Sequence, residues 1–399
     1  MKYSDIQKLE DAGLITAEQR QKILEHFQLR EDGGNQFLAI VSIIGAVLIT
    51  AGLALLIAAH WNEIPRGVKI AAGILLMLGA HAGGWWLREV QGKYRKTGEA
   101  LHLIGSCLFL ANLALLGQIY NIVSRPPNAF LLWWIGLAAL PWLLRSKAQH
   151  FLLLLAFGIW FGLEANERGG WMYCGSERQM LLYALLGLAC LGAGYCLRGT
   201  RFSEFAGVTE KPGLLAFLIF VYPLAWKDFF GWEKSEVHPW FFLALAACAL
   251  VLSAIGIRKL TALPRQWRWT WLAALAGMTV FMATVWFGWW HLDHPGGPRY
   301  SFWGESWSYL AGTIALFVFC LLQIQVGLQE RSPFLVNLGV GFIALDILAA
   351  YCDLFGSMGR TGVMFLVSGI FLIVFGVYLE KKRRALMKQI KPQPTGAIL

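Results

Sequence analysis

The chain has 399 residues, of which 57% are hydrophobic, 14% aromatic and only 15% charged, with a mean hydropathy of +0.55. Soluble domains carry about 25% charged residues, so this composition excludes a disordered chain, a disulfide-rich secreted scaffold and an ordinary cytosolic enzyme. The net charge of +10 would suit a nucleic-acid-binding protein, but the basic residues lie between apolar runs and at the C-terminus, which indicates a membrane protein.

Residues 1–37 are hydrophilic and predict a helical hairpin. Ser4 with Gln7 and Thr16 with Gln19 fit two capping boxes. The hairpin could be a DNA-binding helix-turn-helix, but its seven acidic residues outnumber its five basic ones, so contact with phosphate is disfavoured. We expect a cytoplasmic module that either binds a protein partner or caps the membrane domain.

Twelve apolar segments within residues 38–379 predict an all-α, polytopic transmembrane helical bundle of about 12 spans, because a spanning helix needs about 20 apolar residues. The segments are 38–60, 68–87, 100–119, 129–144, 149–163, 180–197, 213–230, 239–257, 269–290, 308–328, 333–352 and 361–379. The pair 129–144 and 149–163 is short, so these two segments either span the membrane or form a re-entrant hairpin.

The distribution of Lys and Arg predicts the orientation of the chain. With a cytoplasmic N-terminus, 25 of the 34 Lys and Arg residues fall on the cytoplasmic side and 9 on the opposite side, as the positive-inside rule requires. No basic start followed by an apolar core precedes the first span, so we expect no cleavable signal peptide. The sequence therefore predicts a multi-pass protein of a bacterial inner membrane with both termini in the cytoplasm.

The last segment, 380–399, is predicted to be a basic cytoplasmic tail. Lys381, Lys382, Arg383 and Arg384 directly follow the last predicted span. They could bind anionic lipids or a partner. We favour the simpler interpretation that they anchor the end of the span, with their charged groups reaching the membrane surface.

Short motifs at both ends of the chain provide further information. They lie at residues 9–15, 45–52, 57–65, 117–120, 132–141, 351–355 and 380–384. Together they resemble the bacterial predicted membrane proteins classified as domain of unknown function 2157, over roughly the first 150 and the last 70 residues. Cys352 departs from the aromatic-Phe-Asp pattern typical of that family. The resemblance implies a membrane protein and no known activity, substrate or catalytic residue.

Motifs of soluble enzymes are absent from the sequence. It contains no G-x-x-x-x-G-K-[ST], H-E-x-x-H or G-x-S-x-G pattern, and its seven cysteines form no C-x-x-C pair. We therefore predict no cofactor and no activity of a soluble-enzyme type. A membrane-embedded enzyme ranks third among the possible functions, because no pair of candidate acid/base residues has demonstrable geometry. His291, Asp293 and His294 are a weak metal-site candidate, because two His and one Asp in a loop are a poor zinc signature.

The polar residues of the family-like motifs fall at the predicted outer ends of the first, third and eleventh spans. They are His60, Trp61, Asn62, Gln118, Tyr120 and Asp353. We predict that these residues line an outward-facing polar cavity. The alternative is ordinary decoration of the interface, since helix ends are polar and Trp and Tyr favour that region.

Asp346 lies seven residues before Asp353, so both acids occupy one face of the eleventh span. An acid at that depth is costly unless it is paired or solvated, so Asp346 is a candidate for the same cavity. The alternative is a protonated, hydrogen-bonded carboxyl in the core. Polar residues that could pair with it, or simply join helices, are Asn112, Asn337, Gln323 and Gln325.

We expect the protein to transport or handle a small solute or lipid through this cavity. Twelve spans suit that class by architectural analogy, and Pro141 and Pro223 could produce discontinuous helices or ordinary kinks. The alternative is a non-transporting scaffold or sensor that binds a protein partner through residues 1–37, which the scarcity of mid-membrane charge favours. In both cases membrane lipids are partners and nucleic acid is not.

Overall fold

The computed structural model describes most of the chain from residue 63 to residue 356. The described residues are 16, 18–19, 63–92, 94–167, 170, 172–174, 176–226, 239–287, 302–356, 369–370, 373, 376–378, 380–382 and 384–385. The chain divides into two compact units, Met1–Gly73 and Ile74–Leu399.

In the first unit, the structure describes the predicted capping box at Thr16 and Gln19. The Thr16 backbone N–H donates to Gln19 Oε1 at 2.9 Å, and the Gln19 backbone N–H donates to Thr16 Oγ1 at 3.3 Å. This box is therefore confirmed. The other predicted box, at Ser4 and Gln7, lies outside the described residues.

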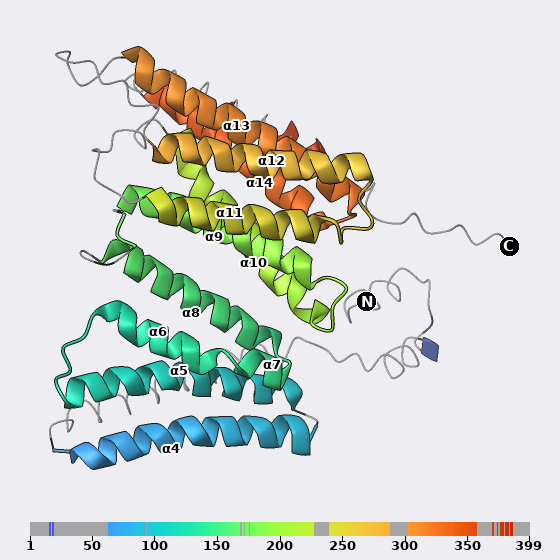
Figure 1. Cartoon of the computed structure of the whole chain (residues 1–399). Helices are drawn as coiled ribbons and strands as arrows, with labels where there is room; N and C mark the ends of the chain where they lie inside the picture. Colours follow the sequence, from blue (N-terminus) through green and yellow to red (C-terminus); the bar gives the residue numbers. More distant parts are fainter. Residues whose placement is uncertain are drawn as a thin grey trace, which may run out of the picture. The chain divides into compact units, whose positions relative to one another are not determined.

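Helices make up every regular element in the described ranges, which confirms the predicted all-α fold (Figure 1). In chain order they are α4 (Arg66–Trp85), the π-helix η1 (Trp86–Val90), α5 (Arg95–Ile119), α6 (Pro126–Leu137), α7 (Leu140–Leu144), α8 (Lys147–Asn166), α9 (Ser176–Leu197), the 3-10 helix η2 (Ser203–Phe205), α10 (Ala206–Val221), the 3-10 helix η3 (Tyr222–Ala225), α11 (Pro239–Ile257), α12 (Arg265–Trp286), α13 (Phe302–Gln329) and α14 (Pro333–Gly356).

The described residues contain nine helical segments that are long and apolar enough to cross a membrane, and α14 adds the shorter apolar stretch Pro333–Ala349. Large apolar side chains on these helices are exposed, such as Leu75 at 68% and Val280 at 62%. Hydrocarbon tolerates such surfaces whereas water does not. The protein is an integral, multi-pass membrane protein. Predicted segments 38–60 and most of 361–379 lie outside the described residues.

The two short predicted spans correspond to helical segments that are longer than hydropathy indicated. α6 and α7 together form the candidate span Pro126–Leu144 of 19 residues, and α8 has 20 residues. Twenty helical residues extend about 30 Å, the thickness of a bilayer core. This length favours two complete spans over a re-entrant hairpin.

Helix α9 is the centre of the second unit, and it packs against α8, α10, α11 and α12 (Figure 1). Glycines allow its backbone to approach its neighbours closely. A Cβ at Gly187 would lie 2.5 Å from the Phe217 backbone nitrogen of α10, and a Cβ at Gly192 would lie 2.6 Å from the Ser253 nitrogen of α11. Larger side chains at these positions would separate the helices.

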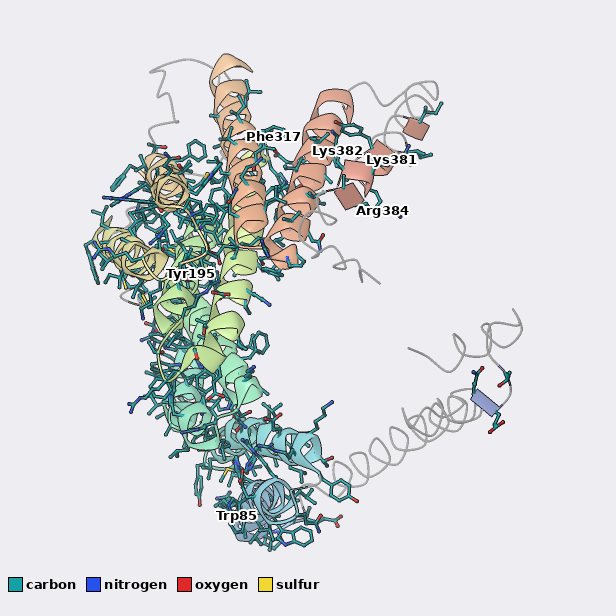
Figure 2. All side chains as sticks on the ribbon, turned by 90° about the vertical axis from the view of Figure 1, so that its right-hand side faces the viewer. Trp85, Tyr195, Phe317, Lys381, Lys382 and Arg384 are labelled. Carbon is teal, nitrogen blue, oxygen red and sulfur yellow. The ribbon has the colours of Figure 1, made fainter. Side chains whose placement is uncertain are left out.

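Aromatic side chains fill the core around α9. Trp271 is fully buried, its Nε1–H donates to the Tyr195 hydroxyl at 3.3 Å, and its ring lies 5.2 Å from that of Phe319. The Phe319 ring is in turn 5.3 Å from Phe217. Figure 2 shows Tyr195 within the densely packed part of the unit. These contacts join α9, α10, α12 and α13.

Two glycines on one face of α8, Gly158 and Gly162, differ in how closely they approach α9. Gly162 packs closely against Tyr183 and Gln179 of α9. At Gly158 a Cβ would meet nothing within 4 Å. The carbonyl of Gly158 instead accepts a hydrogen bond from the Tyr183 hydroxyl at 2.9 Å.

Two glycines of α10 provide a matched test of this helix packing. A Cβ at Gly213 would lie 2.7 Å from the Leu191 nitrogen, whereas Gly207 has open space. We predict that Gly213→Ala destabilises the protein by about 1–3 kcal/mol through overpacking, while Gly207→Ala is neutral or stabilising by less than about 1 kcal/mol. Thermal unfolding of both variants in one detergent measures this difference, and equal melting temperatures would contradict the packing described for α9 and α10.

Candidate functional site

The structure places Gln118 and Tyr120 far from Asp346 along the series of packed helices. Gln118 and Tyr120 are exposed at the C-terminal end of α5, with Tyr120 at 58%. α5 packs against α6, α8 and η1, whereas α14 packs against α13, η3 and α10. Figure 1 shows α8, α9 and α10 between α5 and α14. The structure therefore does not bring Gln118 and Tyr120 together with Asp346.

The remaining candidates lie beyond what the structure describes. His60, Trp61, Asn62, His291, Asp293 and His294 are outside the described residues, and Asp353 is described only as part of the backbone of α14. Their participation in a cavity or metal site stays a prediction. Among the residues that the structure does describe, no group of three or more His, Cys, Asp or Glu could hold a metal ion.

Asp346 is the most unusual polar residue of the described helices. Its side chain is 1% exposed, and neither carboxyl oxygen has a hydrogen-bond partner among the described residues. It lies 13 residues after Pro333, which is about 20 Å along the helix and thus deep in the membrane. An ionised carboxyl at this depth is costly without a cation, hydrogen bonds or water.

Other oxygen atoms on α13 also have no described partner. Thr313 Oγ1 and Gln323 Oε1 are buried without one, although Gln323 Nε2–H donates to the Leu335 carbonyl at 3.0 Å. Gln323 therefore joins α13 to α14, as expected of an interhelical hydrogen bond, while its own oxygen stays unused. Gln325, a second predicted partner, is exposed. Helix α13 thus contains two buried oxygen atoms without a described partner, in addition to the Asp346 carboxyl on α14.

The backbone beside Asp346 changes from α-helix to 3-10 helix. α10 ends at Val221 and continues as η3, which contains Pro223. The Tyr222 hydroxyl donates to the carbonyl of Leu345 at 2.9 Å, next to Asp346 in the chain, and η3 packs against both α13 and α14. Pro223 therefore lies in the 3-10 turn that ends α10, and this turn lies beside the buried acid.

His81 and His102 form a second polar pair, between α4 and α5. Their Nδ1 atoms are 3.1 Å apart, and a Cβ at Gly105 would lie 2.7 Å from the His81 ring. Such a hydrogen bond needs one protonated and one unprotonated Nδ1, so two fully protonated rings are incompatible with it. The contact between the two rings depends on how α4 packs against α5, which the sequence alone does not show.

Arg198 connects three helices through its guanidinium. Its Nε–H and Nη2–H donate to the two carboxylate oxygens of Glu210, and Nη1–H donates to Glu330 Oε2, all at 2.9 Å. Burial disfavours the charge, but the hydrogen bonds to both glutamates and the negative charge of Glu210 outweigh it and raise the pKa of Arg198. The guanidinium also lies 5.1 Å from the centre of the Tyr195 ring, a cation–π contact.

A second ion pair joins the start of α6 to the end of α8. Arg125, just before α6, donates from Nη2–H to Glu164 Oε1 at 2.7 Å. This hydrogen bond and the negative charges of Glu164 and Glu167 raise the pKa of Arg125. Sequence analysis missed both ion pairs. The available signal was an unpaired charge beside each helix end, which does not identify a partner 39 or 132 residues away.

These ion pairs test the predicted alternation of the spans. Two spans separate Arg125 from Glu164, and four separate Arg198 from Glu330. Residues on one side of a membrane are separated by an even number of spans, so both contacts agree with the alternation. In the predicted orientation Arg198 is cytoplasmic and Arg125 lies on the opposite side.

Loss of Arg198 should leave two carboxylates facing each other with little water, because Glu210 and Glu330 are only 13% and 10% exposed. We predict that Arg198→Gln destabilises the protein by about 1–3 kcal/mol, less than for a fully buried pair because Arg198 itself is partly exposed. The control is Arg384→Gln, which removes an exposed pair with Glu380 and should cost at most about 0.5 kcal/mol. Thermal unfolding in detergent measures both, and equal losses would show that the Arg198 network adds no more than a surface pair.

Comparison with known proteins supports the resemblance seen in the motifs. The family model described as "Predicted membrane protein (DUF2157)" matches residues 7–150, a region that includes α4 to α7 but not Asp346. Comparisons with curated proteins and with solved structures found no match. The chain is therefore similar to the DUF2157 predicted membrane proteins over residues 7–150.

Proposed function

We propose that the protein transports or handles a small solute in a bacterial inner membrane, with both termini cytoplasmic, and that Asp346 binds and releases a cation or proton in that process. The observation that supports this proposal is the buried Asp346 carboxyl, whose two oxygens have no partner among the described residues. Ionisable residues inside membranes commonly belong to ion pathways and proton relays.

The cost of Asp346 argues for a role beyond stability. A buried polar group without a hydrogen bond costs about 1–3 kcal/mol, and an apolar side chain would serve better in a purely structural helix. A cation or proton bound at the carboxyl removes that cost in the bound state. The unused oxygen of Thr313 on α13 is of the type that hard cations prefer.

The end of α10 supports the same proposal. A helix end has backbone groups without intrahelical partners, and transporters use such ends to bind ions and substrates. Here α10 changes to η3 at Tyr222, and the Tyr222 hydroxyl is bonded to the residue before Asp346. A membrane scaffold that recruits a partner through residues 1–37 is the alternative, and it needs no ionisable group at position 346.

Replacement of Asp346 by Asn gives the most direct test. A cation that binds only the folded protein stabilises it by about 2.7 kcal/mol at 100 times its Kd. We predict that Na⁺, K⁺ or protons raise the melting temperature of the wild type at constant ionic strength and that Asp346→Asn abolishes this effect. In the absence of that cation the variant should be at least as stable as the wild type, because no charge has to be buried.

The control is Glu204→Gln, which neutralises an exposed acid of η2 and should leave the cation response intact. The functional readout is the flux of H⁺, Na⁺ or K⁺ across proteoliposome membranes on which a gradient of that ion is imposed. Asp346→Asn should abolish flux and Asp346→Glu should retain part of it. Full flux in Asp346→Asn, or a cation response unchanged by that substitution, would contradict the proposal and leave the scaffold as the better explanation.

A further inference from the structure

A cavity of about 340 Å³ lies where α11 ends and α12 begins. Its walls include three arginines, Arg258, Arg265 and Arg268, beside the indole of Trp269 and the apolar side chain of Leu272. The cavity therefore combines a cationic rim with an aromatic and aliphatic wall. That combination suits a ligand with an anionic head and an apolar body.

Arg268 is held in position by the connection between the two helices. Its Nε–H donates to the Leu263 carbonyl at 2.9 Å, and its Nη1–H donates to the Arg258 carbonyl at 3.3 Å. Arginine has five N–H donors, so donors remain for a ligand once these two bonds are made. The planar guanidinium can donate two parallel hydrogen bonds to a phosphate group.

The positive charge of this site is not neutralised within the described part of the chain. Residues 258–268 contain four Lys and Arg and no Asp or Glu. No described carboxylate forms an ion pair with Arg258, Arg265 or Arg268. The N-terminus of α12 begins at Arg265, and the positive end of its dipole adds to the attraction for an anion.

The surroundings of the cavity are those of a membrane interface. Trp269 is 60% exposed, and the apolar residues Val251 and Ile255 on α11 are exposed at 56% and 50%. Trp is enriched at the level of the lipid headgroups, and exposed aliphatic residues below it face the acyl chains. In the predicted orientation the connection between α11 and α12 is on the cytoplasmic side, where the anionic headgroups of a bacterial membrane are accessible.

We propose that this cavity binds the phosphate group of an anionic ligand, either the headgroup of an anionic phospholipid or a free phosphate compound. The three arginines would contact the phosphate oxygens, and Trp269 and Leu272 would contact the apolar part of a lipid. The site is separate from Asp346 and does not depend on the function proposed for that residue.

Native mass spectrometry of the delipidated full-length protein tests whether the cavity binds a lipid headgroup, by comparing phosphatidylglycerol with phosphatidylcholine. The double variant Arg258→Gln/Arg265→Gln removes two exposed charges of the cavity, and Arg145→Gln/Lys147→Gln removes two exposed charges between α7 and α8. Each basic residue near a lipid surface contributes about 1 kcal/mol, so loss of two should weaken phosphatidylglycerol binding by the cavity variant about 30-fold. The control variant should bind it as the wild type does.

The rise in melting temperature caused by inorganic phosphate, measured on the same variants, tests whether the cavity binds a free phosphate compound. If the cavity variant alone loses phosphatidylglycerol binding, the result supports the site and identifies a lipid as the source of the phosphate group. If the cavity variant alone loses stabilisation by phosphate, the result supports the site and identifies a soluble phosphate compound as its ligand. Equal losses in cavity and control variants, or no preference for phosphatidylglycerol over phosphatidylcholine together with no phosphate effect, would overturn the proposal.

Discussion

A hydrocarbon membrane offers no hydrogen bonds, so each polar group within it has to find a partner in the protein. The described helices largely follow this constraint. The Ser106 hydroxyl donates to Gln149 Oε1 at 3.0 Å, and Trp133 Nε1–H donates to the Ser106 carbonyl at 2.8 Å, which joins α5, α6 and α8. Asp346 departs from this pattern, because its two oxygens have no described partner. The proposed function depends on that departure.

The same constraint explains where the charges lie. Arg198 and Arg125 are just outside α9 and α6, and each pairs with glutamates that extend from neighbouring helix ends. At these positions water and headgroups lower the cost of a charge, while the partly buried partners still make strong hydrogen bonds. These contacts link spans that are distant in the sequence and keep them in register. The arginines around the α11–α12 cavity are different because no described carboxylate pairs with them, which leaves their charge available to a ligand.

Hydropathy predicted most of the fold because a spanning helix has to be apolar over a fixed length. Each predicted segment from 68–87 to 333–352 corresponds to a described helix or helical pair. The partners of polar residues could not be predicted in the same way, because helices that pack together can be far apart in the sequence. Asp346 was recognised from its depth alone, whereas its position beside η3 and its distance from Gln118 required the structure. The pairing of His81 with His102 also depends on helix packing that composition does not encode.

The proposed function requires that the buried Asp346 carboxyl bind a cation or a proton, with access for ions or water. An experimental structure in lipid nanodiscs, at a resolution that shows ordered water, tests this claim most directly. We expect density for water or an ion within hydrogen-bonding distance of the Asp346 carboxyl, with Thr313 as a further ligand. A dry, closely packed carboxyl that donates its proton to a neighbouring backbone carbonyl would contradict the claim and make Asp346 a structural residue.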